Sequence, residues 1–435
     1  MAVRKEVDSK GDPVGPEFAL ALVVHTAALL FRNGQTTERS QEEAVHLGKA
    51  LGIEPTILMR WGEILAFADD ERGQHHAVLS AVPANVDMRK VSSTIRLVDR
   101  AIAKDIAPEA IRGEQRAIEA LPPTSTLRFI VLAGLGAAAL GVVFGVSHAG
   151  VLVLIALIAG LGALLRRALA TASGNAFVQP LAAAGLAGAL GAVAIRLGGA
   201  PPDAMVAICP CMVLVPGPHF LNGALDLGRG RIALGSARMV FACLIVVMIC
   251  TGLLAGLSLG GVSLPVTGDF QRVPVVYDVL AAGVAVAAYG TFFDMPWRML
   301  HIPVTIGMLS HAARWVLVFQ AGASAEVGAL VACLIAGTLV TPIAARLHMP
   351  FAALAFASVV SLIPGIFLFR MSSGFVNLVE RGALAPQNLL RDSIVDGATA
   401  FFILIAMAFG LILPRVVIES FLPTLTRARA ASQGR

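Results

Sequence analysis

Residues 239–257 read MVFACLIVVMICTGLLAGL, a run of apolar and small residues without a charged side chain. An α-helix of about 20 such residues spans the roughly 30 Å hydrocarbon core of a bilayer. In the whole chain only 14% of residues are charged and the mean hydropathy is +0.80. A soluble domain carries roughly 25% charged residues. The sequence therefore predicts an all-α polytopic membrane protein.

Further apolar stretches of this kind lie on both sides of residues 239–257. Most approach the length that a membrane-spanning helix needs, although the second is short. Glycines three or four residues apart, such as Gly185 and Gly188 or Gly252 and Gly256, predict close contact between helices. Ten spans are predicted, at 128–146, 149–165, 176–195, 204–222, 236–260, 275–293, 299–319, 325–343, 350–370 and 393–414.

The first 126 residues have a different character. They hold 18 acidic and 15 basic residues, whereas the rest of the chain holds 10 acidic residues and 18 arginines. The apolar run at 18–31 is too short to span a bilayer and is expected to be a buried helix. We predict a small N-terminal α/β cytoplasmic domain, residues 1–126, of order ααβββαα. Its elements are helices at 18–31 and 36–51, strands at 53–59, 63–68 and 77–82, and helices at 88–104 and 108–121.

The orientation follows from the arginines. Residues 1–16 are polar and have no apolar signal-peptide core, so we expect the N-terminal domain to stay in the cytoplasm. With ten spans, both termini are then cytoplasmic, and ten arginines lie on the cytoplasmic side against five on the other, as the positive-inside rule requires. The inner ones are Arg128, Arg166, Arg167, Arg229, Arg231, Arg238, Arg298, Arg346, Arg427 and Arg429, and the outer ones are Arg196, Arg272, Arg370, Arg381 and Arg391.

A Pro-Gly pattern occurs twice at a constant offset. Pro216-Gly217 in the fourth span and Pro364-Gly365 in the ninth are 148 residues apart, as are Pro202 and Pro350. Five spans on each side predict a 5+5 inverted repeat, residues 127–265 and 266–435, with broken helices that place a transport site near the midplane. Proline frees a backbone carbonyl and glycine lets the turn open, which lipid tolerates only beside protein or water. The alternative is that these residues only kink packed helices.

Polar residues in the predicted spans are the candidate site, because charged groups are costly in lipid. The candidates for substrate binding are Pro216, Gly217, Asn222, Pro364, Gly365, Arg314 and Asn175. Those for coupling or gating are Asp226, His219, Arg238 and Asp396.

Each candidate has a structural alternative. Asp226 could form an interfacial pair with Arg229 or Arg238, and His219 could be a satisfied core histidine. Arg314 could bind a substrate carboxylate or pair with Asp396 or Glu326. Asn175 could bond across helices. Asp278 and Asp396, near span starts, are expected to be solvated.

The five cysteines, Cys209, Cys211, Cys243, Cys250 and Cys333, lie in apolar runs without metal-ligand spacing. We interpret them as small buried residues, and expect no metal site and no cofactor. The basic balance comes from arginines flanking spans, so nucleic acid is not an expected partner. The expected partners are a small molecule, an amino acid or a small carboxylate, and the lipid bilayer. A homo-oligomer is left open.

Several of these stretches resemble the threonine/serine exporter family of bacterial membrane proteins. They are the segments 29–38 and 47–52, Val215-Pro216-Gly217-Pro218 with Asn222, Asp226 and Arg238, the segment 292–298, Gly307, Arg314, and Leu362-Ile363-Pro364-Gly365. The resemblance covers nearly the whole chain and implies ten spans in the inner membrane and energised efflux of threonine or serine. Relatives split into two subunits are associated with dicarboxylate export. His219 and Cys209-Pro210-Cys211 depart from the family pattern.

The expected function is a secondary, ion-driven exporter of small polar metabolites. ATP is not expected to drive transport within this chain, because no Walker A motif occurs. Proton coupling and L-threonine or L-serine as substrate are the first hypothesis, and a dicarboxylate such as succinate is the second. An intramembrane enzyme is disfavoured because neither HExxH nor GxSxG occurs. A channel gated by the N-terminal domain is the remaining alternative.

Overall fold

A computed structural model describes residues 15–433 except 72, 198–203, 265–271, 348 and 363. Pro202 of the sequence repeat therefore lies outside the described residues. The chain divides into two compact units. Unit 1 comprises residues up to 32, 37–83 and 93–121, and unit 2 comprises 33–36, 84–92 and 122 onward.

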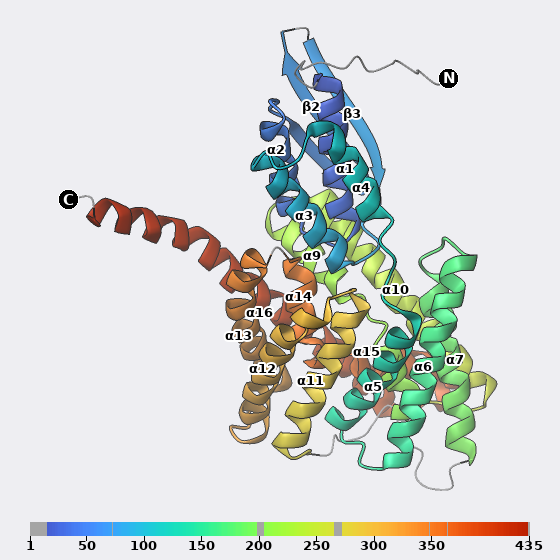
Figure 1. Cartoon of the computed structure of the whole chain (residues 1–435). Helices are drawn as coiled ribbons and strands as arrows, with labels where there is room; N and C mark the ends of the chain where they lie inside the picture. The colour runs from blue at the N-terminus through green and yellow to red at the C-terminus, as the bar shows by residue number, and fades with distance from the viewer. Residues whose placement is uncertain are drawn as a thin grey trace. The chain divides into compact units, whose positions relative to one another are not determined.

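Unit 1 is a three-stranded antiparallel sheet with four helices (Figure 1). The order is ααβββαα, as predicted. The elements are α1 (Pro16–Arg32), α2 (Thr37–Ala50), β1 (Thr56–Arg60), β2 (Gly62–Asp70), β3 (Gly73–Ala81), α3 (Met88–Ile102, whose first turn belongs to unit 2) and α4 (Pro108–Glu119).

The core of unit 1 forms around α1. Residues 19–31 of this helix are mostly buried, and the helix packs against β2 and β3. Gln115 of α4 donates from Nε2 to the carbonyl of Leu22 (2.9 Å) and to Oγ1 of Thr26 (2.8 Å). The prediction that this apolar run is a buried helix is confirmed. The chain turns after α2 at Gly52, whose φ of 84° suits glycine.

Unit 2 is helical apart from its connecting segments (Figure 1). Its elements are α5 (Thr126–Val143), α6 (Ala149–Ala172), α7 (Val178–Leu197), α8 (Met205–Met212), α9 (Gly217–Gly228), α10 (Ile232–Leu259), α11 (Val275–Phe292), η1 (Trp297–Met299), α12 (His301–Phe319), α13 (Ala325–Arg346), α14 (Phe351–Ser358), η2 (Val360–Leu362), α15 (Gly365–Arg381), η3 (Gly382–Leu384) and α16 (Gln387–Gln433).

In the described part of the chain, nine helical segments are long and apolar enough to cross a membrane, and α8 with α9 makes a tenth if that bent pair counts as one span. The chain is thus a multi-pass helical membrane protein. Two predicted bounds are wrong. The second span is not short, because α6 continues to Ala172. The ninth apolar segment runs from Val360 to Leu384 rather than over 350–370, because a break divides it.

Glycines bring α7 and α10 into backbone contact. A Cβ on Gly252 would overlap the carbonyl of Leu181, and a Cβ on Gly188 would overlap that of Leu253. Gly188 and Gly252 each belong to one of the glycine pairs that the sequence singled out for packing. Close approach through small residues is the usual means of helix association in lipid. One cysteine prediction fails, since Cys243 on α10 is exposed.

Candidate functional site

Both Pro-Gly steps begin a helix after a break. Gly217 is the first residue of α9, and α8 and α9 meet at 51°. Gly365 is the first residue of α15, which follows α14 and the short turn η2. Proline cannot donate a backbone hydrogen bond, so each helix starts anew at this step. The sequence therefore located both breaks correctly.

The glycine at each break contacts the helix that precedes the other break. A Cβ on Gly217 would overlap the ring of Phe356, which lies on α14, before the second break. A Cβ on Gly365 would lie 3.3 Å from Cγ of Met212, which is the last residue of α8, before the first break. Each glycine thus faces the helix that precedes the other break. In this structure the side chains of Phe356 and Met212 fill the space beside the two glycines.

Tyr289 satisfies a carbonyl at the first break. Its hydroxyl donates to the carbonyl of Met212 at 2.6 Å, and the Tyr289 side chain is 2% exposed. Its ring also lies near that of Phe356, with centroids 6.2 Å apart. Sequence reasoning missed this residue. The available signal was that the chain has only two tyrosines and that both lie within the predicted span 275–293.

Asp226 lies between two arginines. Its carboxylate is 3.1 Å from Nε of Arg238 and 3.4 Å from a guanidinium nitrogen of Arg231. Asp226 is 2% exposed and Arg238 is 0% exposed, so this pair is buried. Arg229, the other partner considered for Asp226, pairs with Glu419 at 3.2 Å. Arg238, counted above with the arginines on the cytoplasmic side, lies within α10 and not in a loop.

A second ion pair, of a buried acid with a partly buried arginine, joins α15 to α16. Nε of Arg370 is 3.0 Å from Oδ2 of Asp396, which is 5% exposed. Asp396 is therefore not a solvated interfacial residue, and Arg370 is not in a loop. In the first half, the acid lies on α9, after the break, and the arginine lies on α10. In the second half, the arginine lies on α15, after the break, and the acid lies on α16.

Asn222 and His219 of α9 contact segments from the N-terminal part of the sequence that belong to unit 2. Nδ2 of Asn222 donates to the carbonyl of Gly34 at 3.1 Å, while its Oδ1 is buried without a partner among the described residues. His219 is 7% exposed, hydrogen-bonds the backbone of Ala84 and lies edge-on to Phe241. Gly34 and Ala84 thus lie against the face of α9 that carries Asn222 and His219.

Arg314 and Asn175 have other neighbours than the sequence predicted. Arg314 interacts electrostatically with Asp278, not with Asp396 or Glu326. Asp278 is 2% exposed, so its interpretation as a solvated residue is wrong. Asn175 is exposed before α7, where its Oδ1 accepts from the N–H of Phe177 at 2.9 Å. It makes a local turn there.

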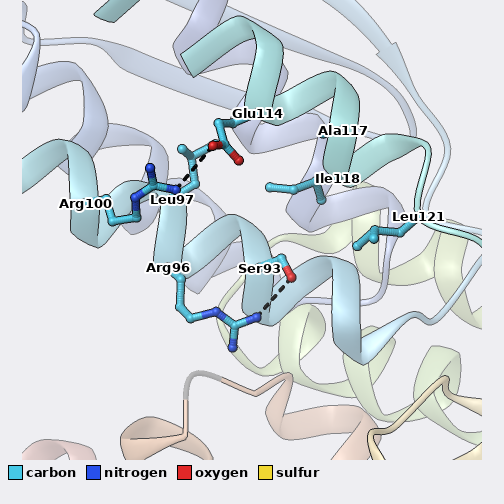
Figure 2. A pocket seen from close by; sticks show the side chains of 8 residues that line it. All are labelled: Ser93, Arg96, Leu97, Arg100, Glu114, Ala117, Ile118 and Leu121. Carbon is cyan, nitrogen blue, oxygen red and sulfur yellow. Dashed lines mark hydrogen bonds and ion pairs between the residues drawn. The ribbon is translucent and has the colours of Figure 1, made fainter. Parts of the chain in front are cut away.

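Unit 1 has two hollows of its own. One, of about 320 Å³, lies between α3 and α4, where Arg100 pairs with Glu114 at 3.4 Å and Arg96 donates to Ser93 (Figure 2). The other, of about 410 Å³, lies beside α1, β3 and α4 and includes His25. Burial lowers the pKa of the His25 imidazole below its usual value. Among the described residues, no group of histidine, cysteine, aspartate or glutamate is arranged to hold a metal ion.

A family model described as a threonine/serine exporter matches residues 21–260, and a second, described as "Threonine/Serine exporter, ThrE", matches residues 278–417. The chain belongs to the threonine/serine exporter family. The first match includes α9 and its break, and the second includes α14, α15 and theirs. No curated protein and no solved structure matches the chain. Membership of this family makes the protein a membrane transporter with a small-molecule substrate.

Proposed function

We propose that the protein is a secondary exporter of small polar amino acids, with L-threonine and L-serine as its substrates. The observation that carries the proposal is the contact between the two helix breaks. Gly217 lies against Phe356, and Gly365 lies against Met212. Broken helices that meet within a membrane are where secondary transporters bind their substrates. Family membership supplies the substrate class.

Backbone groups at the two breaks are suited to bind both charged ends of a zwitterionic amino acid. The carbonyl of Met212, which accepts from Tyr289 in this structure, and the carbonyls before Pro364 are acceptors for an ammonium group. The N-terminal ends of α9 and α15 favour a carboxylate. Phe356 and Met212 occupy the space beside these groups, so transport requires them to move aside. We assign substrate contact to the two Pro-Gly steps and to Asn222, whose Oδ1 has no partner among the described residues.

The two ion pairs are proposed to act in gating. Asp226 with Arg238 fixes α9 to α10, and Arg370 with Asp396 fixes α15 to α16. Each pair therefore makes a break helix move together with the span that follows it. Leaving either charge buried without its partner costs about 3–5 kcal/mol, so each helix and its partner stay together as long as the charges stay buried.

An inverted repeat is part of the proposal. Each half has its break in the fourth of five expected spans, and each ties the helix after the break to the next span by one ion pair. An odd number of spans turns the second half over in the membrane. We further propose that both termini are cytoplasmic and that the membrane is the bacterial inner membrane, in accord with the distribution of arginines.

Counterflow tests the substrate. Purified protein is placed in liposomes preloaded with unlabelled L-threonine, and uptake of labelled L-threonine is followed without an ion gradient. We expect transient accumulation that excess L-serine abolishes and succinate leaves unchanged. Accumulation of labelled succinate instead would favour the dicarboxylate alternative. Empty liposomes and protein with Gly217→Leu serve as controls.

A further inference from the structure

A histidine and an aspartate meet within unit 2, apart from both ion pairs described above. His311 lies near the middle of α12 and is 1% exposed, and Asp278 lies in the first turn of α11 and is 2% exposed. Nδ1 of His311 is 2.7 Å from Oδ2 of Asp278. A carboxylate at this nitrogen fixes the tautomer of an imidazole, so that Nδ1 carries the proton and Nε2 is the free acceptor.

The Nε2 atom of His311 is buried and accepts no hydrogen bond from the described residues. Nε2 of His311 has no hydrogen-bond partner within the described ranges, and neither has the buried Oγ of the adjacent Ser310. Leaving a buried polar atom unsatisfied costs about 1–3 kcal/mol. A group that takes up a proton or a ligand during a working cycle accounts for such an atom.

The charges around His311 come from few elements. Helix α12 packs against α11, α13 and α14 and against the turns η1 and η2. α14 and η2 carry no ionisable residue, and α11 supplies Asp278, the exposed Tyr277 and Tyr289, which is bound to Met212. The remaining ionisable residues on these elements are His301 and Arg314 of α12, Arg298 of η1, and Glu326, Cys333 and Arg346 of α13.

Of these groups, Asp278 and Arg314 act directly on His311. The side chain of Arg314 also lies against α13 at Gly328, where an added Cβ would be 3.2 Å from its Cγ. Arginine stays charged, so Asp278 and Arg314 balance each other while His311 is neutral. A proton on His311 then adds one positive charge to a buried site. A proton gradient across the membrane can drive the release of this proton to one side.

The pair is linked to the second break. Gly307 lies one turn before His311 on the same face of α12, and a Cβ there would lie 2.7 Å from the carbonyl of Ser358 at the end of α14. The next turn, η2, contains Ser361, whose buried Oγ is unpartnered among the residues described. A change of charge at His311 therefore acts next to the segment that has to open.

We infer that His311, oriented by Asp278, is the proton-binding site that couples a proton gradient to transport. The inference rests on the proposed function as a secondary exporter. One proton binds Nε2 when the site faces one side of the membrane and leaves when it faces the other. Asp226 and Asp396 are unsuited to this task, because each carboxylate keeps an arginine within 3.1 Å. Their counterions cannot be titrated away.

The test separates coupling from transport. In liposomes, threonine uptake driven by an imposed pH gradient is compared with threonine counterflow without a gradient. For His311→Gln we expect driven uptake to fall to the level seen without a gradient while counterflow continues. His301→Gln, at the exposed start of the same helix, should leave both unchanged. Driven uptake at the wild-type level, or equal loss of both activities in His311→Gln, would overturn the inference.

A second variant covers the case in which His311→Gln does not fold. Asp278→Asn removes the counterion of the imidazolium, so the pH at which driven uptake is half-maximal should move down by about one unit or more. A lower rate at every pH with an unmoved profile would mean that the pair is only structural. If the wild-type protein shows no threonine counterflow, the proposed substrate is wrong, and the same comparison made with succinate still tests the coupling site.

Discussion

The ring of Phe356 lies against the α-carbon of Gly217, so closely that no other residue type fits at position 217 without a shift. These residues are 139 positions apart and lie on opposite sides of different helix breaks. The contact therefore joins the two halves of the chain at places where the helical hydrogen bonding of each half is interrupted. It also makes residue 217 a sensitive reporter of how the breaks open.

Gly217→Leu should abolish export while the protein still inserts into the membrane, because the change adds apolar volume and no charge. Over-packing of this kind typically costs about 1–3 kcal/mol. The leucine displaces the Phe356 ring and separates α9 from α14. Gly228→Ala, in the same helix with open space around it, should export normally. Threonine efflux and membrane abundance are the two measurements.

The double variant Gly217→Leu with Phe356→Ala should recover part of the export lost by Gly217→Leu alone. Removing the ring leaves a cavity, which typically costs about 3–5 kcal/mol on its own, and the leucine fills part of that space. Thermal melting in detergent should show that the two changes cost less together than separately. Strict additivity would show that the ring and residue 217 do not meet in the working protein.

Asp226→Asn should lower thermal stability strongly, since it leaves Arg238 buried without its nearest carboxylate. Such a loss costs about 3–5 kcal/mol, whereas replacing both partners by apolar residues is often neutral. Asp226→Leu with Arg238→Met should therefore melt close to the wild type. Arg231→Gln, at the more exposed partner, is the control. A harmless Asp226→Asn would show that the pair does not hold α9.

The exchange Arg370→Asp with Asp396→Arg should preserve stability better than either single change. The pair is mostly buried, and reversing it keeps one positive and one negative charge in contact. Asp392, which interacts with Asp396 in the wild type, would also favour an arginine at that position. Melting temperatures of the three variants provide the measurement. Equal destabilisation by all three would contradict the pairing.

Reporter fusions test the orientation. Fusions after Gly174 and after Gly230, in the connections after α6 and α9, should report a cytoplasmic location, and a fusion at Asp269 should report the opposite side. Asp269 itself lies outside the described residues. A cytoplasmic signal there would mean that the first half does not cross the membrane five times, and the inverted repeat would have to be given up.

The fold was largely predictable because its signals are local. Apolar length defines spans, and the Pro-Gly steps define breaks through the chemistry of the backbone itself. The extension of α6 to Ala172 was missed because Arg166 and Arg167 suggested an end, although these long side chains are tolerated near the end of a span. The break in the ninth span was found, yet its effect on the span boundaries was not.

The pairing of charges was harder to predict, because it depends on which helices are neighbours. Asp278 and Asp396 near the starts of spans looked solvated, but each is buried against a residue of another helix, His311 and Arg370 respectively. Arg238, at the start of the predicted span 236–260, was counted with the arginines on the cytoplasmic side, but it is buried. Its pairing with Asp226 was among the alternatives considered, as an interfacial ion pair. The short connection between α9 and α10 brings the two residues together.

The most direct test of the central claim is an electron cryo-microscopy map of the protein in lipid nanodiscs with saturating L-threonine, compared with a map without it. The account predicts ligand density within hydrogen-bond distance of backbone groups at Pro216-Gly217 or Pro364-Gly365, with the Phe356 ring moved away from Gly217. Gly217→Leu should lack this density. Density elsewhere, with both breaks and the Phe356 ring unchanged, would contradict it.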